Sequence, residues 1–338
     1  MVTLADIREA HARLRGVAVR TELAMFPWPE GGNRPGLHQL YLKLENLQPI
    51  GAFKIRGAYN KIASLTPQER ARGVITYSSG NHGQGVAYAA RALGIRAIIV
   101  MPENAPLIKR QATEAMGAAV VLVGPASLER QQKAEELVRQ NGYVMIPPYN
   151  DEKIIAGQGT IGLEILADLP EVDTVLVPVG GGGMISGIAT AIKLIKPTAQ
   201  VIGVEPELAS DAQASLEEGR IIQLSADEAS QTIADGLRTQ SVGPINFEHI
   251  RTYVDKIVTV QEEEIRQAIR VLARNPKTVA EPSGAVAVAA FLFHRDGLPD
   301  RQATVAVLSG GNIDPLMLQQ LESDLTAGSR PSFRTVGT

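Results

Sequence analysis

The sequence predicts an α/β protein built from mainly parallel sheets with helices on both faces. Short apolar runs alternate with amphipathic segments of helical period along most of the 338 residues. This alternation is typical of strand–helix–strand units, in which neighbouring strands run parallel. Runs such as AIIVM and VVLV are apolar throughout, as expected for strands covered on both faces. A chain of this length can form two domains, each with its own core.

Composition excludes several classes of protein. The chain is 44% hydrophobic and 20% charged, which is typical of a globular protein. A net charge of −3 gives no electrostatic case for nucleic acid or an anionic membrane as partner. The absence of cysteine excludes disulfides, thiolate zinc sites and a cysteine nucleophile. Neither a signal peptide nor a membrane span is evident, so we expect a soluble, cytoplasmic protein.

The first half of the chain begins with an amphipathic helix over residues 1–16, for which Thr3 is the expected N-cap. A strand at 40–44 and a helix at 54–65 follow. From residue 74 the alternation becomes regular. We expect strands over 74–77, 97–101 and 119–123, and helices over 81–93, 105–116 and 127–140.

The second half starts after Pro147 and Pro148. We expect helices over 151–169, 184–195, 209–218, 261–273 and 283–293, and strands over 174–179, 201–205, 253–258 and 304–308. The self-contained block between the halves suggests a small substrate-side domain at 73–148, inserted in a large domain made of 1–72 and 149–338. Ligands of such folds bind beyond the carboxyl ends of strands, where loops lead into helices.

Lys54 stands between Phe53 and Ile55, where an extended segment gives way to a helix. An amine partly out of water has a lowered pKa, because desolvation disfavours its charged form. A neutral amine can form a Schiff base with a carbonyl compound. The alternative is a surface lysine that extends its amine into solvent, and Lys54 alone does not decide between them.

Four consecutive glycines, Gly180 to Gly183, join the strand TVLVPV to the helix MISGIATAIKLI. Without Cβ atoms the main chain can turn tightly and direct several N–H groups at one anion beside a helix N-terminus. The run has neither the Gly-Lys-Ser/Thr of a Walker A motif nor the GxGxxG spacing. It favours a phosphate-binding loop over a purely structural turn.

A second loop, Ser78 to Gln84, offers two hydroxyls, an amide and main-chain N–H groups at another helix start. This set suits a substrate carboxylate, with Asn81 free to reach a polar ring substituent. The candidate substrate-binding residues are Ser78, Ser79, Gly80, Asn81 and His82. The alternative is a simple N-cap, and a histidine in the first turn is more often structural than a general base.

Ser309 directly follows the strand TVAVL, where its hydroxyl can meet a heteroaromatic ring nitrogen. A lysine able to form an imine, a glycine-rich phosphate loop and this serine together indicate pyridoxal 5′-phosphate (PLP). A further segment holds Glu205 and Asp211, which can bind a hard cation through oxygen ligands. The alternative for these two carboxylates is a solvated acidic helix start, favoured by the helix dipole.

The chain resembles the fold type II PLP enzymes, specifically the threonine/serine dehydratase and serine racemase group. The resemblance rests on LKLENLQPIGAFKIRGA, SSGNHGQ, VPVGGGGMISGIA, GVEPELASD, TIADGL, EPSGA and LSGGN, which span nearly the whole chain in the family's order. It implies a tryptophan synthase β-like fold of two open, twisted, mainly parallel sheets. It also implies a homodimer or a dimer-based tetramer that acts on a small amino acid.

The resemblance assigns roles to residues. It implies Lys54 as the Schiff-base lysine, Phe53 as packing for the ring, Asn81 as partner of the ring hydroxyl and Ser309 as partner of the pyridine nitrogen. The implied phosphate loop is Gly180, Gly181, Gly182, Gly183 and Met184.

Metal-dependent members hold Mg²⁺ or Ca²⁺ through a glutamate, a main-chain carbonyl and an aspartate, at the spacing found here as Glu205, Ala209 and Asp211. The chain departs from the family pattern at Ala52, where a serine is usual. It also ends soon after LSGGN, so we expect no carboxy-terminal regulatory domain.

The implied reaction is β-elimination of water from a 3-hydroxy amino acid such as threonine or serine, with Lys54 removing the α-proton. A 2-oxo acid and ammonia result. Racemisation is the alternative, alone or beside elimination, because Ser79 occupies a position that is often serine in racemases. Hydroxyaspartate dehydratases also carry serine there, so Ser79 permits racemisation without establishing it. As substrates, 3-hydroxyaspartate, phenylserine or another β-hydroxy amino acid fit the same chemistry. A PLP-bound sensor without catalysis is a third class.

Overall fold

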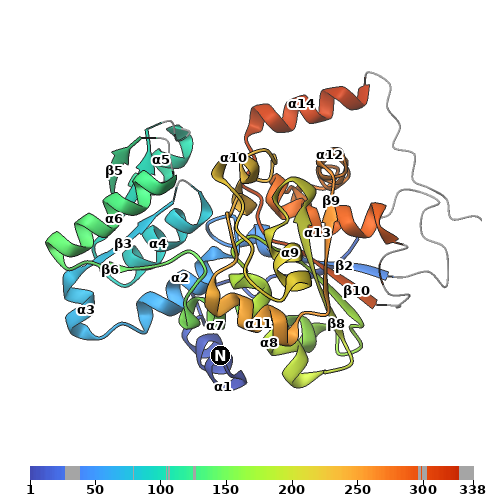
Figure 1. The fold of residues 1–338 in the computed structure, drawn as a ribbon, viewed down its shortest axis with the longest axis horizontal. Coiled ribbons are helices and arrows are strands. Elements are labelled where there is room, and N and C mark those ends of the chain that lie inside the picture. The colour runs from blue at the N-terminus through green and yellow to red at the C-terminus, as the bar shows by residue number, and fades with distance from the viewer. Residues whose placement is uncertain are drawn as a thin grey trace, which may run out of the picture.

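The computed structural model describes residues 1–26, 39–78, 80–103, 105, 107–124, 127–295, 298 and 303–326. Two sheets organise these residues, one on each side of Figure 1. The larger sheet has the strand order β1-β2-β10-β7-β8-β9, and the smaller has the order β5-β4-β3-β6. Every pairing is parallel except that of β1 with β2. The predicted fold class is therefore confirmed.

The strands are short, as is usual in α/β proteins. Their bounds are β1 Leu23–Met25, β2 Gln39–Leu44, β3 Val74–Tyr77, β4 Ala97–Pro102, β5 Ala119–Val123, β6 Val144–Met145, β7 Thr174–Pro178, β8 Gln200–Pro206, β9 Lys256–Val260 and β10 Ala303–Leu308. The helices are α1 Leu4–Arg13, α2 Lys54–Ala63, α3 Pro67–Arg72, α4 Asn81–Ala92, α5 Leu107–Ala115, α6 Ser127–Asn141, α7 Glu152–Asp168, α8 Gly183–Ile195, α9 Asp211–Glu218, α10 Ala226–Ala229, α11 Pro244–Tyr253, α12 Glu262–Leu272, α13 Pro282–Phe293 and α14 Pro315–Thr326.

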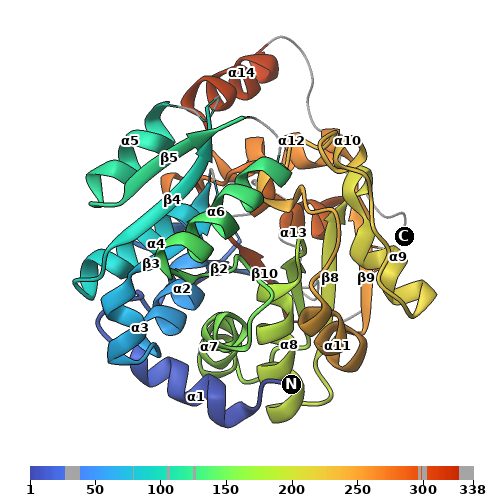
Figure 2. The ribbon, with the colours of Figure 1, turned by 60° about the vertical axis from the view of Figure 1, so that its left-hand side comes forward.

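Helices cover both faces of the larger sheet, and the strands are apolar on both sides for that reason. In β10, Ala306 and Leu308 join a core with α12 and α13, whereas Val305 and Val307 face the core formed by α7, α8 and α11. Helix α1 packs beside α7 and α8 at the lower edge of Figure 2. Its predicted cap is confirmed, because Thr3 and Asp6 form a capping box.

The smaller sheet is also covered on both faces. In β4, Ile99 and Met101 pack with α2 and α4, while Ile98 and Val100 face α6. All four strands of this sheet fall within the block proposed as the inserted domain. Helix α2 precedes that block, yet its residues Ala58 and Ile62 belong to the small sheet's core. We keep the division at residues 73–148 as a proposal, with α2 as the element that joins the two sheets.

The structure corrects the expected strand at 253–258. Tyr253 ends helix α11, which the sequence interpretation missed, and the strand β9 begins only at Lys256. Pro244 at the first helical position, after Gly243 as N-cap, is the overlooked start signal. The helix expected from residue 209 also begins later, at Asp211, after a 3₁₀ turn over Glu207–Ala209. Within the described part of the chain, no helix has the length and apolarity to cross a membrane.

Candidate active site

Two of the predicted loops are joined by main-chain hydrogen bonds. The Phe53 N–H donates to the Ser309 carbonyl at 3.1 Å, and the Gly311 N–H donates to the Gly51 carbonyl at 2.9 Å. These bonds fix the start of α2, where Lys54 is the first helical residue, against the end of β10. The loops lie far apart in the sequence, but the parallel sheet brings the carboxyl ends of β2 and β10 together.

The Lys54 amine lies in the interior of this loop cluster. It donates to the Pro148 carbonyl at 2.9 Å and lies 5.1 Å from the centre of the Phe53 ring. Burial lowers the pKa of Lys54 to about 8, and the negative charge of Glu281 acts in the opposite direction. The residue as a whole is half-buried rather than fully buried. The interpretation as a solvated surface lysine is therefore excluded.

The glycine run forms a cradle that larger residues would fill. A Cβ at Gly181 would lie 2.3 Å from the Tyr149 ring, and one at Gly183 would lie 3.0 Å from the Tyr149 side chain. Gly182 is the N-cap of α8 and has a φ of 89°, which favours glycine. Since Tyr149 follows Pro148, the segment that holds the Lys54 amine also packs on the glycine run. The loop has the geometry of an anion site at a helix N-terminus.

Ser309 is 4% exposed at the end of β10. Its hydroxyl reaches the Ser283 carbonyl only at 3.4 Å, which is a weak hydrogen bond. The Ser283 hydroxyl in turn accepts the Gly236 N–H at 2.8 Å, and Gly236 lies beside the first glycine of the run. Ser309 can therefore turn its hydroxyl to a ring nitrogen without breaking a strong bond.

Asn81, the first residue of α4, is held from two sides. Its amide nitrogen donates to Glu281 Oε1 at 2.6 Å, and its amide oxygen accepts from Asn312 Nδ2 at 2.8 Å. Asn312 also donates to the Ile50 carbonyl at 2.9 Å. Neither Glu281 nor Asn312 was among the site residues predicted from sequence, although both lie in motifs that marked the family.

The other described residues of the second loop make separate hydrogen bonds. Gly80 is the N-cap of α4 and donates its N–H to the Ser78 hydroxyl at 3.2 Å. The His82 ring is buried and lies 3.0 Å from the Ile146 carbonyl. Burial, followed by the charge of Lys54, lowers the pKa of His82 to about 3, so the ring is neutral and a poor base. Ser79 lies outside the described residues.

Glu205 and Asp211 form a buried acidic pair rather than a solvated helix start, since both are 0% exposed. The Glu205 carboxylate accepts the N–H groups of Ala212 and Gln213 at 3.0 and 2.8 Å. No donor among the described residues meets either Asp211 carboxylate oxygen in hydrogen-bond geometry.

The electrostatics of this pair follow from burial. Burial raises the pKa of Asp211 to about 7, partly opposed by nearby main-chain N–H groups. Burial and the charge of Asp211 together raise the pKa of Glu205 well above its usual value. Ala209, the predicted carbonyl donor, is buried beside them. An unpartnered carboxylate of this kind is what a missing cation would leave, so the residues fit a hard metal ion.

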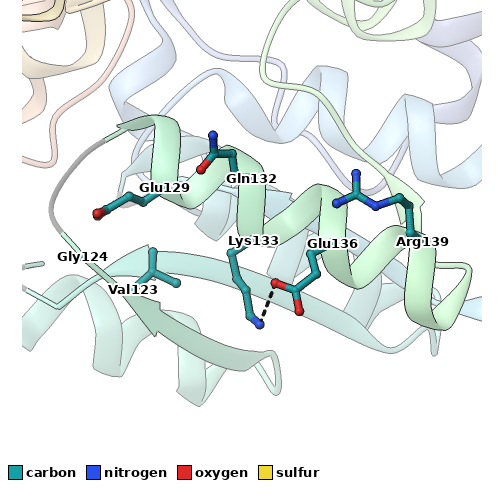
Figure 3. A pocket seen from close by; sticks show the side chains of 7 residues that line it. All are labelled: Val123, Gly124, Glu129, Gln132, Lys133, Glu136 and Arg139. Carbon is teal, nitrogen blue, oxygen red and sulfur yellow. Dashed lines mark hydrogen bonds and ion pairs between the residues drawn. The ribbon is translucent and has the colours of Figure 1, made fainter.

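An open hollow of about 570 Å³ lies elsewhere, between the end of β5 and one face of α6 (Figure 3). It includes the surface ion pair of Lys133 and Glu136, whose N–O distance is 3.0 Å. The lining residues are Val123, Gly124, Glu129, Gln132, Lys133, Glu136 and Arg139. None of the predicted site residues borders it, so it is separate from the candidate active site.

Comparison with known protein families shows to which family the chain belongs. The family described as pyridoxal-phosphate dependent enzyme matches residues 19–310. The chain belongs to this family. As a pyridoxal-phosphate dependent enzyme it uses PLP, and the partly buried amine, the glycine cradle and the weakly held Ser309 hydroxyl fit that cofactor.

Relatives and solved structures of the pyridoxal-phosphate dependent enzymes narrow the comparison. The chain is 48% identical to an L-threonine ammonia-lyase of Thermotoga maritima, over 95% of this chain and 78% of that protein. It is 44% identical to the catabolic L-threonine dehydratase TdcB of Escherichia coli, over 95% and 96% of the two chains.

Among solved structures, threonine deaminase isoform 2 of Solanum lycopersicum has a TM-score of 0.88 at 38% identity and covers 96% of this chain, with 88% of its own chain matched. A serine racemase of Dictyostelium discoideum has a TM-score of 0.85 at 36% identity, over 93% of this chain and 99% of that one. The predicted group, which unites dehydratases and serine racemases, is thus confirmed.

Proposed function

We propose that this chain is a PLP-dependent threonine ammonia-lyase that eliminates water from L-threonine, and that it also acts on L-serine. The observation that carries the proposal is the position of the Lys54 amine, with its lowered pKa, between the glycine cradle and the Ser309 and Asn81 loops. The relatives named for threonine support the choice of substrate.

The roles of individual residues are part of the proposal. Lys54 would hold the cofactor covalently, with the Phe53 ring packed nearby. The main-chain N–H groups of Gly180 to Gly183 and Met184 would bind its phosphate at the N-terminus of α8. Ser309 would meet the ring nitrogen as a neutral hydroxyl, and Asn81 the ring hydroxyl. Ser78, Ser79, Gly80 and His82 would surround the substrate carboxylate, His82 through its main chain.

In this reaction bound PLP withdraws electrons from the substrate Cα and so acidifies its proton. Lys54 would be the base for that proton, with its amine free of the cofactor while the substrate is bound. Its pKa of about 8 suits a base that must be neutral near physiological pH. The β-hydroxyl leaves with a proton as water. Hydrolysis of the released enamine consumes one water, so threonine yields 2-oxobutanoate and ammonia in equal amounts.

Racemisation is the second candidate, because it needs an acid–base group opposite Lys54 and Ser79 occupies a sequence position that is often serine in racemases. The solved serine racemase at 36% identity supports this possibility less strongly than the threonine enzymes support elimination. We propose elimination as the main activity. 3-Hydroxyaspartate and phenylserine are the other substrates to compare.

The activity experiment is a panel of β-hydroxy amino acids assayed for 2-oxo acid and ammonia, combined with chiral chromatography of the remaining substrate. L-threonine should give 2-oxobutanoate at the highest kcat/KM. Formation of D-serine from L-serine beside pyruvate would add racemisation. Full occupancy by PLP with no product from any member of the panel would contradict the proposal and favour a sensor.

We also propose a Mg²⁺ or Ca²⁺ site formed by Glu205, Asp211 and the Ala209 carbonyl, supported by the unpartnered Asp211 carboxylate. Removal of metal by EDTA should lower the melting temperature, and Mg²⁺ or Ca²⁺ should restore it. Asp211→Asn should abolish that response. A melting temperature that is indifferent to EDTA and to both ions would contradict the site.

For the whole enzyme we propose a cytoplasmic homodimer or dimer-based tetramer, as the family resemblance implies. Light scattering after size-exclusion chromatography tests the assembly, and a monomeric mass would contradict it.

A further inference from the structure

A chain of side-chain hydrogen bonds crosses the centre of the candidate site. It runs from the Ile50 carbonyl to Asn312 Nδ2 at 2.9 Å, and from the same nitrogen to Asn81 Oδ1 at 2.8 Å. It ends where Asn81 Nδ2 donates to Glu281 Oε1 at 2.6 Å. Four segments meet in this chain: the segment before α2, the start of α4, the loop after β10 and the N-cap of α13.

The two ends of the chain fix the orientation of both amides. A main-chain carbonyl and an ionised carboxylate can only accept hydrogen bonds. The Asn312 nitrogen must therefore face Ile50, and the Asn81 nitrogen must face Glu281. Asn81 Nδ2 has a second hydrogen, so the side chain presents a donor to whatever binds beside it. Without the Glu281 carboxylate, only the hydrogen bond from Asn312 would hold the Asn81 amide in this orientation.

The surrounding main chain is shaped to admit Glu281. A Cβ at Gly310 would lie 2.2 Å from Glu281 Oε1 and 3.2 Å from Asn81 Nδ2, so the glycine leaves room for both groups. The Glu281 N–H donates to the Gly310 carbonyl at 3.1 Å, and the side chain is 5% exposed. As the N-cap residue of α13, Glu281 lies at the end of the helix dipole that favours a negative charge.

We propose that Glu281 is a positioning residue: its carboxylate holds Asn81 as a hydrogen-bond donor toward the cofactor ring and places a negative charge beside the Lys54 amine. The inference rests on the proposed roles of Lys54 and Asn81. It gives a role to Glu281, a buried acidic residue that takes no part in the proton transfers of the proposed reaction.

Of the titratable groups compared around Lys54, Glu281 is the one whose charge acts on the Lys54 pKa. On α4, the buried His82 ring is neutral, because burial and the charge of Lys54 lower its pKa to about 3. The segment that contributes the Pro148 carbonyl also holds Tyr149, whose pKa burial raises to about 12, so it is neutral as well. From α13, Glu281 opposes the lowering of the Lys54 pKa that burial causes. Removing this negative charge should lower the Lys54 pKa further and leave more neutral amine below pH 8.

The experiment measures how fast the protein, freed of PLP, takes the cofactor up again between about pH 6 and about pH 10. Uptake requires the neutral amine, so its rate should rise with pH through the Lys54 pKa. For Glu281→Gln we expect the midpoint to fall by about one unit, since a neighbouring opposite charge shifts a pKa by roughly one to three units. This variant should take up PLP faster than wild type at acidic pH, yet hold it several-fold more weakly.

Three variants separate the effect of the Glu281 charge from the effect of the hydrogen bonds around Asn81. Glu281→Asp keeps the charge and should move the midpoint back toward wild type. Asn312→Ala breaks the amide chain but keeps the charge, so PLP should bind more weakly with an unchanged midpoint. Glu263→Gln, an exposed glutamate on α12, is the matched control and should change neither quantity. If Glu281→Gln does not fold, Glu281→Asp and Asn312→Ala still test the proposal.

Uptake by Glu281→Gln that is slower by the same factor at every pH would overturn the proposal, as would an unchanged midpoint. A midpoint that falls by about one unit in Glu281→Asp or in Asn312→Ala, both of which keep the charge, would overturn it too. Lys54→Ala in parallel distinguishes a failure of the proposed function. If that variant still fixes PLP covalently, the Lys54 assignment is wrong, whatever Glu281 does.

Discussion

Lys54 reaches its position through the main chain around it more than through its own side chain. The N–H of the preceding Phe53 donates to the Ser309 carbonyl. The Lys54 amine donates to the carbonyl of Pro148, in the segment that packs on the glycine run. An amine with a pKa of about 8 changes protonation near physiological pH. Cofactor uptake should therefore slow as the pH falls below 8, because the ammonium form cannot add to a carbonyl.

The glycine run offers a matched pair of substitutions. Gly181→Ala should weaken PLP binding by about tenfold or more, since its Cβ would lie 2.3 Å from the Tyr149 ring and displace the loop. Gly180→Ala places a Cβ 3.3 Å from the Gly236 carbonyl, a contact that a small shift relieves, so its effect should be smaller. Titration with PLP, followed by absorbance or fluorescence, measures both. Equal losses in the two variants would contradict the cradle geometry.

At the scale of elements, a buried ionic network anchors α2, the helix that Lys54 begins. Arg56 donates to Glu45 at 2.7 and 2.8 Å and to Glu164 at 2.7 and 2.8 Å. Lys43 forms a second ion pair with Glu164 at 2.7 Å. All four side chains are 5% exposed or less. The network ties the end of β2, the start of α2 and the C-terminal part of α7 together.

Removing Arg56 should leave two buried carboxylates without their main partner. We expect Arg56→Met to lower the free energy of unfolding by about 3–5 kcal/mol. Arg251→Met removes an exposed pair with Glu248 and should cost less than about 1 kcal/mol. Urea unfolding at neutral pH measures both. A loss for Arg56→Met no larger than that for Arg251→Met would show that the network does not anchor α2.

The same network predicts a pH dependence. Burial alone would raise the pKa of Glu45, but the charges and hydrogen bonds of Arg56 outweigh it and lower that pKa. A carboxyl with a lowered folded-state pKa stabilises the protein above its unfolded pKa, and the contribution is lost as the pH falls through the folded pKa. The stability difference between wild type and Arg56→Met should therefore narrow at acidic pH.

The elements also show what sequence patterns could predict. The loops of Lys54, Gly180 to Gly183 and Ser309 were evident because glycine, serine and lysine follow apolar strands. Helix α11 was missed because Pro244 was not recognised as a helix start, and its last residue was then assigned to a strand. Local signals of capping decide such boundaries, and apolar content alone does not.

At the scale of the whole molecule, the contacts that complete the site are those that sequence patterns could not reveal. Glu281 is 200 residues from Asn81, and Asn312 is 231 residues from it. Their meeting depends on the parallel order of β2, β10 and β7 and on the packing of α13 under that sheet. The burial of Glu205 and Asp211 likewise follows from tertiary packing, since their composition equally suited a solvated helix start.

The most direct test of the account is to locate the cofactor on the chain. The PLP-loaded protein is reduced with borohydride, digested and analysed by mass spectrometry. We predict that the peptide containing Lys54 carries the added mass of the reduced cofactor, and that Lys54→Ala carries none on any peptide. Modification of a different lysine in the wild-type protein, or unchanged modification of Lys54→Ala, would contradict the central claim.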